Sequence, residues 1–138
     1  MKKQILVLLL LISALIPASL HAQAHLGITD AEIMNLHPDK TFQSAYTNSG
    51  QRYIYTAMQF GTFYYYFDKS TQLSVYCMQV PGTMQDLNSQ VEIYNQKYAS
   101  TSKNSWTAYL DGGGVMYITL RYAEDIKGYY FYYTQASQ

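Results

Sequence analysis

Residues 51–80 read QRYIYTAMQFGTFYYYFDKSTQLSVYCMQV, and this stretch decides the fold because large apolar side chains alternate in it with tyrosine. Alternation with a period of two is typical of β-strands, and it predicts strands at about 51–60, 62–68 and 72–80. Gly61 separates the first two strands, and residues 68–71 link the second pair. Because such short turns join antiparallel neighbours, the stretch predicts an antiparallel meander.

A helix follows this meander. Leu87, Val91, Tyr94 and Tyr98 lie on one stripe of a helix with 3.6 residues per turn, and Thr83 is a suitable N-cap. Three further strands are expected at about 105–110, 115–123 and 128–134. The polar residues 41–50 and 100–102 are predicted to be loops.

A shorter helix precedes the first strand. Thr29 and Glu32 have the spacing of a capping box, and His37-Pro38 ends the pattern. The predicted fold class is therefore α+β: an antiparallel β-sheet with two helices packed on one face, in the order αβββ-αβββ. Two halves with the same order suggest a duplication.

The first 24 residues have the composition of an export signal. Lys2 and Lys3 precede an apolar run of about 12 residues, and Ala22-Gln23-Ala24 offers a small-x-small cleavage site. The run is shorter than the ~20 residues that a membrane-spanning helix needs. We expect a signal peptide over 1–24, cleavage after Ala22 or Ala24, and a single α+β domain over 25–138 in the periplasm or outside the cell.

Charge and cysteine content exclude several classes of protein. Without Lys2 and Lys3 the chain has seven basic and nine acidic residues, a net charge of about −2. This balance gives no electrostatic basis for binding nucleic acid or an anionic membrane. Cys77 is the single cysteine, so no intrachain disulfide can form, and it is expected to be a small buried side chain or to pair between molecules.

The two faces of the predicted sheet differ in composition. One parity of each strand is mostly aliphatic or phenylalanine and should face the helices, with Leu87, Val91 and Tyr94 against Phe63, Val75, Ile118 and Phe131. Tyr129 and Tyr133 share the parity of Phe131. The opposite parity is rich in tyrosine. It holds Tyr76 and the candidate binding residues Tyr53, Tyr55, Tyr64, Tyr66, Tyr109, Tyr117, Tyr130 and Tyr132.

These tyrosines have two interpretations. They can be structural, because tyrosine favours strands and pairs well across them. They can also form a recognition surface, since tyrosine offers a large contact area at low entropic cost.

No motif predicts catalysis, a metal site or a cofactor. Residues 111–114 read Asp-Gly-Gly-Gly between two strands, which indicates a hairpin turn rather than a phosphate loop. Trp106 could stack on a sugar, but its parity favours the core. Cleavage after Ala22 would expose Gln23-Ala24-His25, an amino-terminal X-X-His sequence that can bind Cu(II).

The stretch Leu26-Gly27-Ile28-Thr29-Asp30-Ala31-Glu32-Ile33 resembles the Gly-x-Thr-x-x-x-[Val/Ile] helix start of small exported α+β modules. These modules include the outer-membrane assembly lipoprotein BamE and the tandem-repeat β-lactamase inhibitory protein. The resemblance implies the architecture only. The disulfides of the inhibitory protein cannot form here.

The functional prediction is an exported, non-enzymatic binding protein. Its tyrosine-rich open sheet face would bind a protein partner, as an inhibitor or as an envelope-assembly component. The alternative is a carbohydrate- or small-ligand-binding module that uses the same tyrosines. A sugar site would need a narrow groove with amide or acid groups beside the rings, whereas a protein site would be broad and poor in acid.

Overall fold

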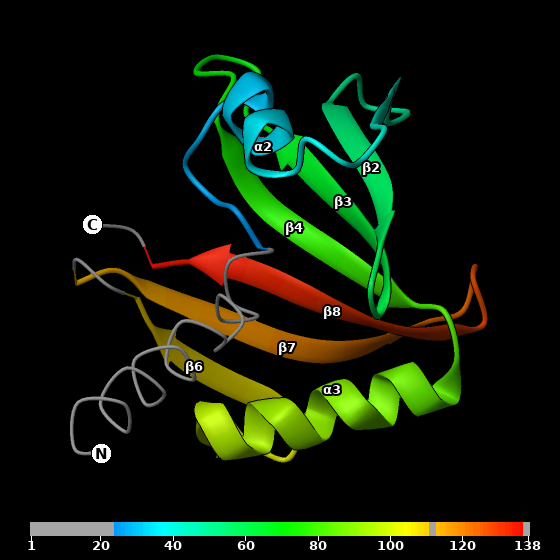
Figure 1. Ribbon diagram of the computed structural model, residues 1–138, viewed down its shortest axis with the longest axis vertical. Helices are drawn as coiled ribbons and strands as arrows, with labels where there is room; N and C mark the ends of the chain where they lie inside the picture. Colours follow the sequence, from blue (N-terminus) through cyan, green and yellow to red (C-terminus); the bar gives the residue numbers. More distant parts are fainter. Residues whose placement is uncertain (1–23, 111–112, 137–138) are drawn as a thin grey trace, which may run out of the picture.

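One antiparallel sheet of eight strands runs through the molecule in the order β1-β2-β3-β4-β8-β7-β6-β5 (Figure 1). The computed structural model describes residues 24–110 and 113–136. The predicted signal sequence up to residue 23, and residues 111 and 112 of the predicted Gly-rich turn, lie outside the described residues. The elements are α2 (Asp30–Leu36), β1 (Gln43–Tyr46), β2 (Arg52–Met58), β3 (Gly61–Phe67), β4 (Ser74–Pro81), α3 (Met84–Lys97), β5 (Ala99–Ser102), β6 (Ser105–Tyr109), β7 (Val115–Ala123) and β8 (Gly128–Gln135).

The α+β class and the antiparallel sheet are confirmed, but the predicted order αβββ-αβββ is wrong. Each helix is followed by four strands, because residues predicted to be loops form β1 and β5. Both are polar strands of four residues at the two edges of the sheet, and every residue of β5 is exposed. A strand that buries neither face has no need of apolar alternation, so its sequence resembles a loop.

The two halves of the chain meet in the middle of the sheet. In each half a helix precedes a four-stranded meander, and the last strands, β4 and β8, pair antiparallel from Tyr76–Thr134 to Gln79–Phe131. This repeated order is what a duplication would produce, and the duplication itself stays a prediction.

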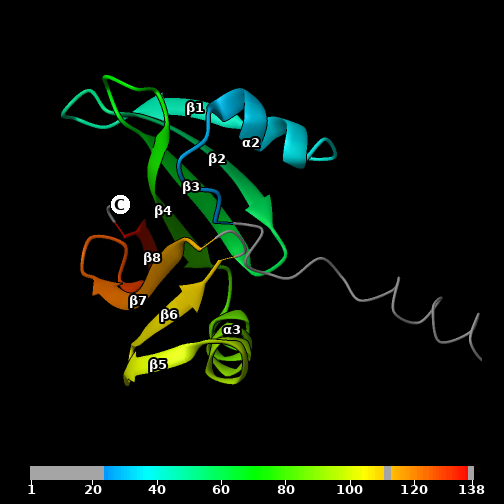
Figure 2. The same cartoon turned by 90° about the vertical axis from the view of Figure 1, so that its left-hand side faces the viewer.

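The predicted layer of two helices on one face is not matched. Figures 1 and 2 show α2 near β2 and β3 at one end of the molecule and α3 near β6 at the other. With seven and 14 residues, the helices are too short to cover an eight-stranded sheet. Ala24 is buried, and Leu26 and Ile28 pack against the core, so the segment before α2 completes this cover.

The inward parity of the strands forms the core, as the alternation predicts. The rings of Phe63, Tyr65 and Phe67 on β3 and of Phe131 and Tyr133 on β8 are at most 1% exposed. From α3, Leu87 and Tyr94 are buried, and Val91 packs partly buried against the core.

Trp106 is 1% exposed and donates its Nε1–H to Asn95 Oδ1 at 2.8 Å, so it is a core residue and not a platform for a sugar. Cys77 is buried as expected.

Two predicted core residues are instead exposed. The register between β3 and β4 shifts after Tyr66, so that Phe67 pairs with Ser74. Val75 is therefore unpaired in a bulge, and its side chain is 41% exposed. Tyr129 is 43% exposed because it lies close to the β7–β8 turn, away from both helices. None of the helices among the described residues is both long and apolar enough to cross a membrane.

Candidate functional site

Six tyrosines on the outward parity of β2, β3, β4 and β8 gather on one face of the sheet. Register explains this, because residues directly opposite each other on neighbouring strands point to the same side. Tyr53 is opposite Tyr66, Tyr66 is opposite Tyr76, and Tyr55 is opposite Tyr64. We call this set the tyrosine cluster: Tyr53, Tyr55, Tyr64, Tyr66, Tyr76 and Tyr132.

The rings of the tyrosine cluster touch one another in a continuous row. The centroids of Tyr66 and Tyr76 are 4.5 Å apart with the rings 16° from parallel, and Tyr55 and Tyr64 stack at 5.3 Å and 20°. Tyr76 contacts Tyr132 at 5.5 Å. The row ends on a cation, because the guanidinium carbon of Arg121 lies 4.2 Å from the centroid of the Tyr132 ring.

Burial partly desolvates some of the hydroxyl groups in the tyrosine cluster. Burial, and to a smaller extent the neighbouring Tyr76, raises the pKa of Tyr66 to about 12. Burial also raises the pKa of Tyr64. Tyr55 donates its hydroxyl hydrogen to Gln43 Oε1 at 2.5 Å, and Tyr76 donates to Gln51 Oε1 at 3.0 Å. The amide groups beside the rings therefore orient them.

The structure separates two of the other predicted binding residues, Tyr109 and Tyr117, from this cluster. Tyr109 and Tyr117 lie on β6 and β7, 76% and 47% exposed, and among the described residues no ring contact joins them to the cluster. Tyr130 is also outside the row. Tyr76 shares the predicted face but was not among the predicted binding residues, and it is the ring that links β3 to β8.

A shallow hollow of about 380 Å³ borders the tyrosine cluster. Its lining comes from β3, β4, β8, the end of β7 and the β7–β8 turn, which contributes one carboxylate, Asp125. It is lined by Tyr64, Tyr66, Met78, Val80, Ala123, Asp125, Ile126 and Tyr130.

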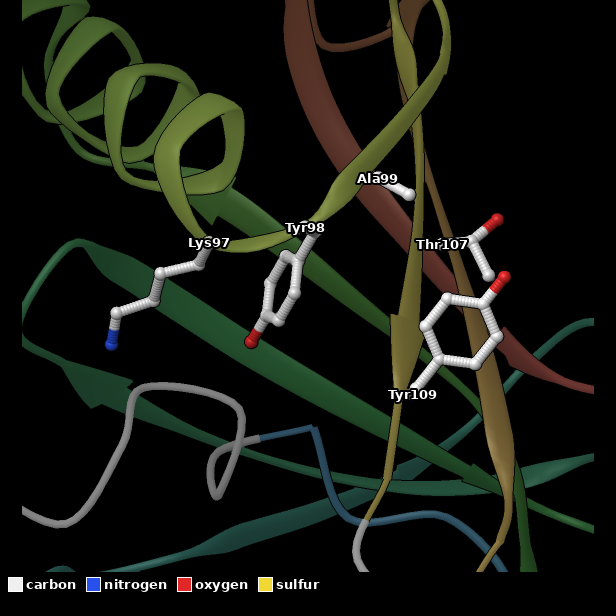
Figure 3. A pocket seen from close by; sticks show the side chains of 5 residues that line it. All are labelled: Lys97, Tyr98, Ala99, Thr107 and Tyr109. Atoms are coloured by element: carbon white, nitrogen blue, oxygen red, sulfur yellow. The ribbon is translucent and has the colours of Figure 1, made fainter.

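A second hollow, of about 310 Å³, lies at the β5 edge of the sheet. Figure 3 shows Lys97 and Tyr98 on one side of β6 and Thr107 and Tyr109 on the other. Because these groups point to opposite faces of the sheet, they do not converge on a common ligand.

Two polar arrangements were not foreseen from the sequence. Gln90 of α3 and Gln79 of β4 are buried and hydrogen-bonded to each other, and Tyr133 donates to Gln79 Oε1 at 2.7 Å. The hydroxyls of Tyr94 and Tyr133 are 2.6 Å apart. This buried polar network lies inside the core, where burial raises the pKa of Tyr133 well above its usual value.

The second arrangement is a pair of histidines. Nε2 of His25 lies 2.8 Å from Nε2 of His37, which is the C-cap of α2. Burial, and then the neighbouring His37, lowers the pKa of His25 to about 4, and burial also lowers the pKa of His37. The spacing of 12 residues between them follows no motif, so no sequence signal could have paired them.

Within residues 24–110 and 113–136, no three histidine, cysteine or acidic side chains gather as a metal cluster. No protein-family model, no curated protein and no solved structure matches this chain. The candidate site therefore rests on its own geometry.

Proposed function

We propose that this chain is an exported, non-enzymatic binding protein whose tyrosine cluster binds a protein partner. The observation that carries the proposal is the continuous row of partly exposed, mutually stacked rings from Tyr55 to Tyr132, with Arg121 at its end. Tyrosine and arginine are enriched at the energetic centres of protein interfaces.

Stacking prepares these rings for binding. A side chain that its neighbours already hold in place loses little freedom when a partner covers it, so more of the contact energy appears as affinity. Tyr66 contacts Tyr53 at 5.1 Å and Tyr76 at 4.5 Å, and Tyr55 is further held by Gln43. The cluster thus combines a hydrocarbon surface with fixed hydroxyl groups.

The shape and charge of the surface favour a protein over a small ligand. The cluster spans four neighbouring strands, a width of about 14 Å at the usual strand spacing. Arg121 is the charged side chain that stacks on it. A broad, aromatic surface with little charge is the composition of an interface centre.

The predicted export signal and the resemblance to small exported modules indicate the compartment in which the partner would be met. A partner would be met in the periplasm or outside the cell, as an enzyme that is inhibited or an envelope component that is assembled. Both partner classes offer surfaces large enough to cover several strands.

The test begins with in-cell crosslinking from a photoreactive residue placed at Tyr64, followed by purification of the crosslinked protein and measurement of its Kd. Tyr66→Ser and Tyr132→Ser should each weaken binding by about tenfold or more, because interface anchors contribute about 2 kcal/mol. Tyr46→Ser is the matched control, since Tyr46 is 67% exposed on β1 and outside the cluster. Equal affinity of all three variants would contradict the proposal.

A carbohydrate remains the second candidate, and one observation favours it. The hollow beside the cluster joins the rings of Tyr64, Tyr66 and Tyr130 to the carboxylate of Asp125, a combination that suits a sugar. In that case Asp125→Asn should abolish binding to a glycan array, whereas a protein interface centred on Tyr76 should tolerate it.

A further inference from the structure

Tyr66 and Tyr76 stack more closely than the other ring pairs of the tyrosine cluster. They lie directly opposite each other on β3 and β4, with centroids 4.5 Å apart and planes 16° from parallel. We propose that this pair is a site of oxidative crosslinking, at which a haem peroxidase and hydrogen peroxide join the two rings as dityrosine. This modification goes beyond the binding of a partner and does not depend on it.

The reaction removes one hydrogen atom from each phenol. Each hydroxyl group loses a proton to water and an electron to the oxidised haem of the peroxidase, which leaves two phenoxyl radicals. The radicals form a bond between one ortho carbon of each ring. Each of these carbons then loses its hydrogen as a proton, and each phenol oxygen regains one. Two tyrosines and one hydrogen peroxide thus give one dityrosine and two waters.

The nearly parallel arrangement of the two rings suits this bond. The unpaired electron of a phenoxyl radical occupies π orbitals that are perpendicular to the ring and extend to the ortho carbons. In the stack of Tyr66 on Tyr76 these orbitals face each other, so a bond can form across the gap between the rings.

A second pair of tyrosines provides the contrast. Tyr122 and Tyr129 are also directly opposite each other, on β7 and β8, but their planes are 71° apart. In this edge-on arrangement the π orbitals do not face each other. The pair should therefore couple poorly, although its side chains are 50% and 43% exposed and thus open to an oxidant.

The neighbouring rings of the tyrosine cluster can deliver radicals to the stacked pair. Tyr53 contacts Tyr66 with centroids 5.1 Å apart, and Tyr132 contacts Tyr76 with centroids 5.5 Å apart. Because electrons transfer readily between phenols in contact, an oxidation that begins at either neighbour can move to the pair. All four rings are partly exposed, so an oxidant can reach the row at more than one point.

The crosslink would supply a covalent restraint that cysteine does not provide in this chain. Cys77 is the single cysteine, and it is buried on the face of β4 opposite to Tyr76. A bond between Tyr66 and Tyr76 would close the loop that joins β3 to β4, and a closed loop restricts the unfolded chain. The predicted setting outside the cytoplasm is oxidising, as the reaction requires.

The experiment treats the purified, folded protein at low concentration with a haem peroxidase and hydrogen peroxide. The monomer is then isolated and digested with trypsin, which separates Tyr66 in residues 53–69 from Tyr76 in residues 70–97. The crosslink should join these two peptides in a product that has the blue fluorescence of dityrosine and a mass two hydrogens below their sum. Fragmentation in the mass spectrometer should place the bond on Tyr66 and Tyr76.

Conservative variants test the assignment. Tyr66→Phe and Tyr76→Phe should each abolish the joined peptide, because phenylalanine keeps the ring but cannot form a phenoxyl radical. Tyr122→Phe is the matched control from the edge-on pair and should leave the yield unchanged. Thermal melting checks that each variant is folded, and the two variants of the stacked pair test the crosslink independently of each other.

Three results would overturn the proposal. Dityrosine found only in covalent dimers would assign the coupling to tyrosines of two molecules, such as the highly exposed Tyr109. A main product that joins residues 122–127 to residues 128–138 would show that exposure, and not stacking, selects the site. An equal yield of the joined peptide from protein oxidised in denaturant would show that the fold does not select the pair.

Discussion

The two halves of the chain share one order of elements but present different surfaces. β2, β3 and β4 of the first half carry Tyr53, Tyr55, Tyr64, Tyr66 and Tyr76, which stack in one row. On the second half, Tyr132 alone joins this row, and Tyr109 and Tyr117 are separate and more exposed. One scaffold therefore supports either a continuous aromatic surface or scattered rings, and strand register decides which.

On the inward face, the two halves differ at the central strand pair, β4 and β8. When the two halves are aligned about this antiparallel pair, Cys77 of β4 takes the position of Phe131 of β8. Gln79 of β4 then takes the position of Tyr133. The second half thus supplies the large rings beneath the middle of the sheet, and the first half supplies small and polar side chains that make room for them. A packed interior requires such complementarity between neighbours.

The largest expected effect tests this inward difference. Phe131→Ala should lower the free energy of unfolding by about 3–5 kcal/mol, because it removes a ring that is 0% exposed and contacts both Tyr94 and Trp106. Cys77→Ala, at the corresponding position, should cost about 1 kcal/mol. Denaturant unfolding measures both values. Equal costs would show that the halves contribute alike to the core.

A smaller effect is expected from the buried polar network. Tyr133→Phe removes the hydroxyl that donates to Gln79 Oε1 and meets Tyr94, and should cost about 1–3 kcal/mol because buried polar groups lose their partners. Tyr129→Phe, in the same strand and 43% exposed, is the matched control and should fall within about 0.5 kcal/mol. A neutral Tyr133→Phe would mean that the network does not stabilise the junction of α3 with the sheet.

The outward difference predicts a third effect. Tyr66→Ala removes a ring that touches Tyr53 and Tyr76, and should cost about 1–2 kcal/mol from lost aromatic contacts and burial. Tyr117→Ala on the second half should cost within about 0.5 kcal/mol. Thermal melting compares the two. If Tyr117→Ala were the more damaging variant, the contrast between stacked and scattered rings would be wrong.

The last effect concerns alkaline pH. The folded pKa of Tyr66, about 12, lies above the ordinary value of 10, so Tyr66 favours folding below pH 10. Above pH 10 the unfolded chain loses this proton first, and the contribution disappears as the pH rises toward 12. Tyr66→Phe should therefore flatten the decline of stability over this window, measured by denaturant unfolding at several pH values. An unchanged slope would show that Tyr66 is solvated like an ordinary tyrosine.

Local pattern alone determined much of this molecule. The alternation in residues 51–80 and 105–134 was enough to predict six strands, the antiparallel class and, except at Val75 and Tyr129, the inward and outward parity. The capping box at Thr29 and Glu32 and the stripe from Leu87 to Tyr94 were enough to predict both helices. These features are readable because each depends on residues within a few positions of one another.

Tertiary structure decided what depends on distant neighbours. β1 and β5 exist because an adjacent strand offers free backbone groups, and the bulge at Val75 arises from pairing with β3. The row from Tyr55 to Tyr132 required the β4–β8 junction, and the meeting of His25 with His37 required the chain to turn back through α2. Sequence spacing carries no signal for such contacts, because the chain that separates the partners sets no distance between them until the sheet has formed.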